Sequence, residues 1–151
     1  MIRKSRLAAL VLVPAFAGLA AAPASAAAPV TNLFASLNGT NEVFATGTPK
    51  AGMTGAGDLD GKGQAHVRLT GTKLCWNFSA AKIAATVAAH IHSGAAGTNG
   101  PVVVPLTVKP GCVTVTSTLA ASIKAQPSQF YVNVHTAQFL GGAVRGQLGK
   151  A

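Results

Sequence analysis

The chain has 151 residues, with twelve Lys and Arg against three Asp and Glu and a formal net charge of +9 at pH 7. This length suits one domain with a hydrophobic core, and the basic residues stand singly without interleaved aromatics, which argues against a nucleic-acid-binding protein. The chain has few acids, which argues against the carboxylate pair that a typical glycosidase needs. None of the acids is near a histidine in sequence, so no set of nucleophile, base and orienting group supports a hydrolase.

The first 26 residues predict a secretory signal peptide. A basic head, MIRKSR, precedes the apolar run LAALVLVPAFAGLA and a small-x-small cleavage site, Ala24-Ser25-Ala26. The Ala-rich composition is typical of a bacterial signal. Cleavage would leave residues 27–151 with a net charge of +6, because three basic residues are lost. No later apolar run reaches the roughly 18 residues needed to span a bilayer, and no cysteine at the cleavage site could carry a lipid. We therefore expect a soluble, exported domain.

Short β-branched or aromatic segments dominate the rest of the chain. TNLFASLNGTNEVF alternates apolar and polar residues before the turn signal Asn38-Gly39, and the Gly-rich stretch 47–64 predicts a further strand with few large side chains. Seven more strand-like segments follow: AHVRLTG, KLCWNFSA, ATVAAHIHS, GPVVVPLTV, GCVTVTS, QFYVNVHT and GGAVRGQLG. Only Ser117 to Pro127 has helical composition, with a Ser/Thr start and a proline stop. The sequence thus predicts an all-β antiparallel sandwich or Greek-key barrel with one short helical crossover.

Two cysteines, Cys75 and Cys112, lie in this part of the chain. An even number of cysteines in an exported domain indicates a disulfide between them, and two buried free thiols are the alternative. A bridge across this separation would be structural, since closing such a loop stabilises a domain by about 3 to 4 kcal/mol in the chain-entropy model.

Three of the four histidines form the main candidate site. His90 and His92 stand two apart on a predicted strand, so they share one face while Ile91 points to the other. In FYVNVHT, Tyr131, Asn133 and His135 likewise share a face. Three imidazoles without a carboxylate suit Cu or Zn. The alternative is a buried hydrogen-bond cluster of the three with Asn133, Asn99 and the turn backbone. His66 shares a face with Arg68 and is expected to face solvent.

Four motifs give the chain a family resemblance. They are LNGTNEV at Leu37 to Val43, AHIHSGAAGTNGPVV at Ala89 to Val103, YVNVHT at Tyr131 to Thr136 and GAVRGQL at Gly142 to Leu148. In this order they resemble the CHRD domain, named after chordin, over nearly all of residues 27–151. In chordin these domains accompany cysteine-rich modules that bind growth factors. Such modules are absent here, so the resemblance implies the domain and not growth-factor binding.

A second resemblance concerns the histidines alone. The chain resembles Cu/Zn superoxide dismutases in the order of four residues, His90, His92, His135 and Arg145. In those enzymes a His-x-His strand, a histidine on a late strand and a C-terminal arginine surround copper. Between His92 and Val103 there is no further histidine or aspartate. The bridging ligand and zinc subsite of that family therefore have no counterpart.

Glu42 and Arg145 both lie in motifs of the CHRD resemblance. We expect an ion pair between them that joins the first and last strands, with an anion contact of Arg145 as the alternative. The predicted function is that of an exported CHRD-like β-domain that acts by binding or structural association, without catalysis, on an extracellular or envelope partner. The alternative is a secreted mononuclear Cu or Zn metalloprotein, dismutase-like or otherwise, built on His90, His92 and His135.

Overall fold

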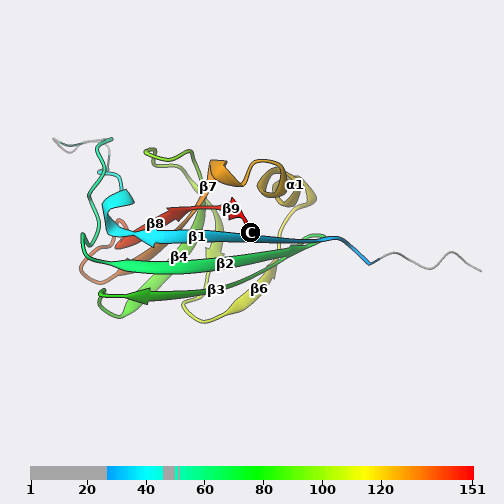
Figure 1. Ribbon diagram of the computed structural model, residues 1–151, viewed down its shortest axis with the longest axis horizontal. Helices are drawn as coiled ribbons and strands as arrows, with labels where there is room; N and C mark the ends of the chain where they lie inside the picture. The colour runs from blue at the N-terminus through cyan, green and yellow to red at the C-terminus, as the bar shows by residue number, and fades with distance from the viewer. Residues whose placement is uncertain (1–26, 46–49, 51) are drawn as a thin grey trace, which may run out of the picture.

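The computed structural model describes residues 27–45, 50 and 52–151, so the predicted signal peptide lies outside the described residues. Strands dominate the described chain (Figure 1), as predicted. They are β1 (Val30–Asn38), β2 (Lys62–Thr70), β3 (Lys73–Ala81), β4 (Thr86–Ser93), β5 (Val102–Leu106), β6 (Gly111–Thr114), β7 (Phe130–Thr136), β8 (Val144–Gln147) and β9 (Gly149–Lys150). Two 3-10 turns, η1 (Gly39–Asn41) and η2 (Pro127–Gln129), and one helix, α1 (Ser117–Ala125), complete the set. No helix in these ranges is long and apolar enough to cross a membrane.

The strands form one antiparallel sheet that curves into a nearly closed barrel. Its order is β5-β4-β7-β8-β1-β2-β3-β6, and β9 adds to β1. The two ends of this order approach each other through the turn between β5 and β6. There the indole N–H of Trp76 on β3 donates to the carbonyls of Thr107 and Lys109, both at 3.2 Å. The predicted antiparallel β-class is confirmed.

Buried and exposed side chains alternate along the strands, and the buried ones fill the inside of the barrel. On β1 the side chains of Leu33, Ala35 and Leu37 are buried, and those between them are exposed. The same period repeats along β2 and β3, because successive side chains of a strand point to opposite faces. The predicted helix is confirmed as α1: the Thr116 hydroxyl caps it by accepting from the Leu119 N–H at 3.2 Å, and Ala120 and Ile123 join the core.

The predicted disulfide is present. Cys75 on β3 and Cys112 on β6 are directly opposite each other in the antiparallel pair, and their sulfurs are bonded. The bond fastens the edge strand β6 to the sheet. The Gly-rich strand predicted over 47–64 is wrong for the described part of that stretch: before β2 begins, it contributes one isolated bridge, Thr54 to Val43. Glycines there supply no side chains that a strand could pack.

Strand β7 differs from the others because it is buried along its whole length. Val132 and Val134 point into the core, whereas Tyr131, Asn133 and His135 point outward under a cover of loops. The loops are the connections β1–β2, β4–β5 and β7–β8, which reach these side chains through Glu42, Gly100 and Leu140 respectively. The barrel therefore has a second buried layer on this side, and that layer is polar.

Candidate functional site

The polar layer brings the three predicted histidines together. His90 and His92 lie on one face of β4, and antiparallel pairing sets them opposite Asn133 and Tyr131 of β7. His135 follows two residues later on β7. One ring nitrogen from each histidine can be chosen so that all three lie within 4.8 Å of one another, and His90 Nδ1 is 3.0 Å from His135 Nε2. The predicted convergence of His90, His92 and His135 is thus found in the structure.

Backbone carbonyls fix the tautomers of two of these rings. His92 Nδ1 lies 2.9 Å from the Gly100 carbonyl oxygen, and His135 Nδ1 lies 2.9 Å from that of Leu140. A carbonyl only accepts, so each Nδ1 carries the proton and each Nε2 keeps its lone pair. His135 Nε2 then accepts from His90 Nδ1–H. His92 Nε2 is buried and, within the described part of the chain, has no hydrogen-bond partner.

Burial also keeps the three rings neutral. It is the main cause that lowers the pKa of His90, His92 and His135 below the usual 6.5. For His92 and His135 the neighbouring imidazoles lower the pKa further, against the opposing effect of their backbone hydrogen bonds. At neutral pH the cluster therefore offers lone pairs and not positive charges.

Tyr131 and Arg145 support the ring of His92. The His92 and Tyr131 rings stack with centroids 4.8 Å apart and planes 8° from parallel. The Arg145 guanidinium carbon lies 3.6 Å from the centre of the same Tyr131 ring. Because β7 lies between β4 and β8, the tyrosine ring is held from both sides. Arg145 also donates to Thr98 O at 2.7 Å and Asn99 Oδ1 at 3.2 Å, which fixes the loop that carries Gly100.

Glu42 enters this layer from the β1–β2 connection as a buried acid with an unusual charge state. It is 2% exposed, and both carboxyl oxygens accept from Asn133 Nδ2, at 2.9 and 3.0 Å. Burial raises its pKa to about 8, although the charge of Arg145 and the Asn133 hydrogen bond act in the opposite direction. Gly142 packs directly on the carboxyl: a Cβ there would lie 2.5 Å from Glu42 Oε1.

The expected Glu42–Arg145 ion pair stays a prediction. Both side chains are buried in one layer, and Arg145 acts electrostatically on Glu42. The hydrogen bonds of Arg145 nevertheless go to Thr98 and Asn99, and the carboxyl receives its hydrogen bonds from Asn133. A carboxyl with a pKa near 8 is mostly protonated at pH 7, which weakens the attraction.

A pocket of about 340 Å³ opens beside the cluster. Polar groups of Glu42, His92 and Asn133 line it together with the apolar side chains of Phe44 and Phe139. The Asn133 Oδ1 atom is buried and, among the described residues, has no partner. The pocket gives water-sized molecules a route to the side of His92.

Sequence reasoning found the histidines but missed their supports. His66 is exposed on β2 and does not join the cluster, in agreement with its predicted solvent-facing position. The stacking role of Tyr131 and the Glu42–Asn133 contact were not predicted. Tyr131 and Asn133 could have been suspected, since they share the strand face of His135. The contact with Glu42 depends on how a long loop folds back, for which the sequence carries no short-range signal.

A family model for the CHRD domain matches residues 33–148 of the chain. The matched region runs from β1 to the residue after β8 and contains every residue of the polar layer. No curated protein matches the chain. No solved structure matches it either.

Proposed function

This chain belongs to the CHRD family of extracellular binding modules, and from that premise we propose that it is an exported module whose ligand is one Cu(II) or Zn(II) ion. His90, His92 and His135 would hold the ion. The domain would have no catalytic activity without the metal. Loaded with copper, it would have an open coordination position at which a small molecule such as superoxide could react.

The observation that carries this proposal is the buried Nε2 of His92, which has no hydrogen-bond partner among the residues that the structure describes. A buried polar atom without a partner destabilises a protein by about 1 to 3 kcal/mol, so it calls for an explanation. One ring nitrogen of His92 also lies within 4.8 Å of ring nitrogens of the two other histidines. A metal ion among the three would satisfy all of them.

The hydrogen bonds around the rings support the same proposal. Histidines that bind metals usually donate their other N–H to a carbonyl or carboxylate, which fixes the ring and raises its basicity. His92 and His135 both do so, to Gly100 and Leu140. The 3.0 Å between His90 Nδ1 and His135 Nε2 also suits two ligands of one ion, since metal–nitrogen bonds of roughly 2.0–2.1 Å place such nitrogens about 3 Å apart. His90 would then bind as the tautomer protonated on Nε2.

A second candidate function follows from the hydrogen bond between His90 and His135. In that hydrogen bond the two ring nitrogens satisfy each other without any metal, and the bond links β4 to β7. In this case the histidines stabilise the loops, and the domain acts only by binding a partner. The two functions differ in whether an ion is required.

Calorimetric titration of the exported, metal-free protein with Cu(II) and with Zn(II) at pH 7.5 separates them. We expect one ion per chain, and we expect His90→Ala, His92→Ala and His135→Ala each to weaken binding at least about tenfold. His66→Ala is the matched control, because it removes an exposed imidazole from another face. No binding at micromolar metal, or equal binding by all four variants, would leave the structural role as the function.

The pH dependence provides a further check of the same site. Metal and protons compete for the imidazole lone pairs, and burial lowers the pKa of all three histidines below 6.5. We therefore expect the affinity to stay nearly constant from pH 8 to about 6.5 and to fall only at lower pH. A steep fall already between pH 8 and 7 would show that other groups bind the ion.

A further inference from the structure

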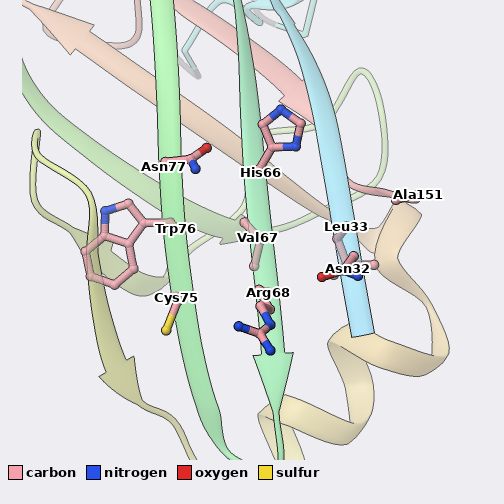
Figure 2. Close-up of a pocket in the computed structure, with 9 residues that line it drawn as sticks. All are labelled: Asn32, Leu33, His66, Val67, Arg68, Cys75, Trp76, Asn77 and Ala151. Carbon is pink, nitrogen blue, oxygen red and sulfur yellow. The ribbon is translucent and has the colours of Figure 1, made fainter. Parts of the chain in front are cut away.

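We propose that the outer face of β1, β2 and β3 binds an anionic glycopolymer, meaning a chain of sugar or polyol units that carry carboxylate or phosphate groups. This face holds an open pocket of about 460 Å³ (Figure 2), separate in its residues from the histidine cluster. Asn32, His66, Arg68, Cys75 and Asn77 line it with their side chains, and Leu33, Val67, Trp76 and Ala151 complete the wall. The inference does not depend on a metal.

Strand register explains why these polar side chains meet. Asn32 pairs with Arg68, which pairs with Cys75, so one row crosses all three strands. The next row on the same face is formed by Phe34, His66 and Asn77. Neighbouring strands lie about 4.8 Å apart, so side chains of one row can contact the same ligand group.

The hydrogen-bonding groups of this face are unused. Among the described residues, the side chains of Asn32, His66, Arg68 and Asn77 make no hydrogen bond or ion pair that the structure records. The guanidinium of Arg68 thus has five free N–H donors in a planar fork. Such a fork binds carboxylate or phosphate in two parallel hydrogen bonds. The amides on either side can reach hydroxyl groups of the same ligand.

The charges around the face favour an anion. Lys73 follows Arg68 across the β2–β3 turn on the same face, and no Asp or Glu lies among the residues that line the pocket. Of the three acids, Glu42 is buried in the other layer, and Asp58 and Asp60 precede β2. Arg68 is near the opposite end of that strand, about 20 Å from its start at a rise of roughly 3.3 Å per residue. These three acidic side chains are therefore too distant to neutralise Arg68.

The shape and the aromatic content favour a sugar-containing polymer. The pocket is open to solvent on the outside of the curved sheet and is not an enclosed cavity, so an extended ligand can lie across it. Phe34, 43% exposed and next to His66, offers an apolar ring on which the C–H groups of a sugar can pack. One aromatic ring is too few for the stacking platforms that hold single-stranded nucleic acids.

The disulfide makes this surface rigid. Cys75 is the direct neighbour of Arg68 in the row, and its bond to Cys112 fixes β3 against β6. A surface whose backbone is fixed loses less conformational entropy on binding than a flexible one. The backbone positions that carry the free donors of the row are thus fixed before a ligand binds.

Fluorescence titration with labelled polymers at about 50 mM salt tests the proposal, with polygalacturonate as the carboxylate probe, poly(glycerol phosphate) as the phosphate probe and dextran as the neutral probe. We expect at least one acidic polymer to bind and dextran not to bind, and the stronger acidic probe identifies the anion. Arg68→Gln should weaken binding at least fivefold. Lys50→Gln, which removes the same charge from the β1–β2 connection, should change it less than twofold.

Three results would overturn the proposal: no binding of either acidic polymer, equal weakening by Arg68→Gln and Lys50→Gln, or equal affinity for double-stranded DNA. The second and third would mean general charge attraction, which rises with net charge alone. Equal unfolding midpoints of the two variants establish that both are folded. His135→Ala protein should bind the polymer as the unaltered protein does, so failure of the metal site leaves this test intact.

Discussion

The two outer faces of this barrel carry the same kinds of side chain in opposite surroundings. Across β4, β7 and β8, His90, Asn133 and Arg145 stand in one register row, in which Asn133 and Arg145 are buried and His90 is half-buried. Across β1, β2 and β3, a row with Asn32 and Arg68 stays open to solvent. The buried arginine makes hydrogen bonds to Thr98 and Asn99, whereas no such bond is recorded for the open one within the described chain.

The difference shows that burial under loops, and not the type of residue, decides which ligands a polar strand face can bind. Under loops, buried polar groups need partners, so ring orientations become fixed. Among the described residues, two buried atoms of this layer have no partner, His92 Nε2 and Asn133 Oδ1. Without loops, water satisfies the same groups, and they remain available to a large ligand. A closed layer thus suits an ion, and an open face suits a polymer.

The largest expected effect tests the rigidity of the open side. Replacing Cys75 and Cys112 together with serine removes a link between positions 37 residues apart, and should lower the free energy of unfolding by about 4 kcal/mol. Urea unfolding with and without the substitutions measures this. Metal binding by the folded fraction should remain, because the cluster lies on β4 and β7. Loss of metal binding in folded protein would show that the two sides are coupled.

Arg145→Ala tests the covered side. The substitution removes two hydrogen bonds from a charged donor and the contact with the Tyr131 ring, from a residue that is 2% exposed. We expect the free energy of unfolding to fall by about 3 kcal/mol. Arg145→Lys should recover only part of it, since an ammonium lacks the planar fork. Full stability of the alanine variant with loss of an anion ligand would instead favour the anion-contact role of Arg145.

Glu42 makes the stability of the covered side depend on pH. Its pKa is raised from 4.5 to about 8, so the folded protein holds a proton that the unfolded chain releases between these values. Stability from this group is complete below pH 4.5 and is lost as the pH rises towards 8. Between pH 7.5 and 8.5, where the histidines are largely neutral in both states, we expect a loss of about 0.5 to 1 kcal/mol.

Glu42→Gln is the matched variant for this prediction, because it resembles the protonated acid in shape and cannot ionise. Its free energy of unfolding, measured by urea titration at several pH values, should be nearly constant between pH 7.5 and 8.5. Below pH 6.5 both proteins should lose stability, since the unfolded chain protonates histidines whose pKa is lowered in the folded state. A slope above pH 7.5 that is the same in the variant and in the unaltered protein would mean that Glu42 is ionised in the folded protein.

Local patterns predicted most of the fold and half of the site. Alternation and turn residues identified the strands from β1 to β8, because strand period and turn chemistry act over a few residues. The same period placed His90 with His92 and Tyr131 with His135. The contact that the loop makes between Glu42 and Asn133 joins residues 91 positions apart. The pairing of β4 with β7 also joins distant residues, and no local pattern specifies either contact. The prediction of a strand in the Gly-rich stretch before β2 failed because glycines supply no side chains that a strand could pack.

Arg68→Ala should have the smallest effect on stability, and it completes the comparison with Arg145. Arg68 is exposed, and its side chain is assigned no hydrogen bond or ion pair in the described chain, so folding gains little from it. Substitutions at such surface positions usually change the free energy of unfolding by less than about 0.5 kcal/mol. Urea unfolding of the Arg68→Ala and Arg145→Ala proteins side by side measures the difference directly. A loss above 1 kcal/mol at Arg68 would mean that the open face is a structural surface, and the polymer-binding proposal would lose its premise that these donors are free.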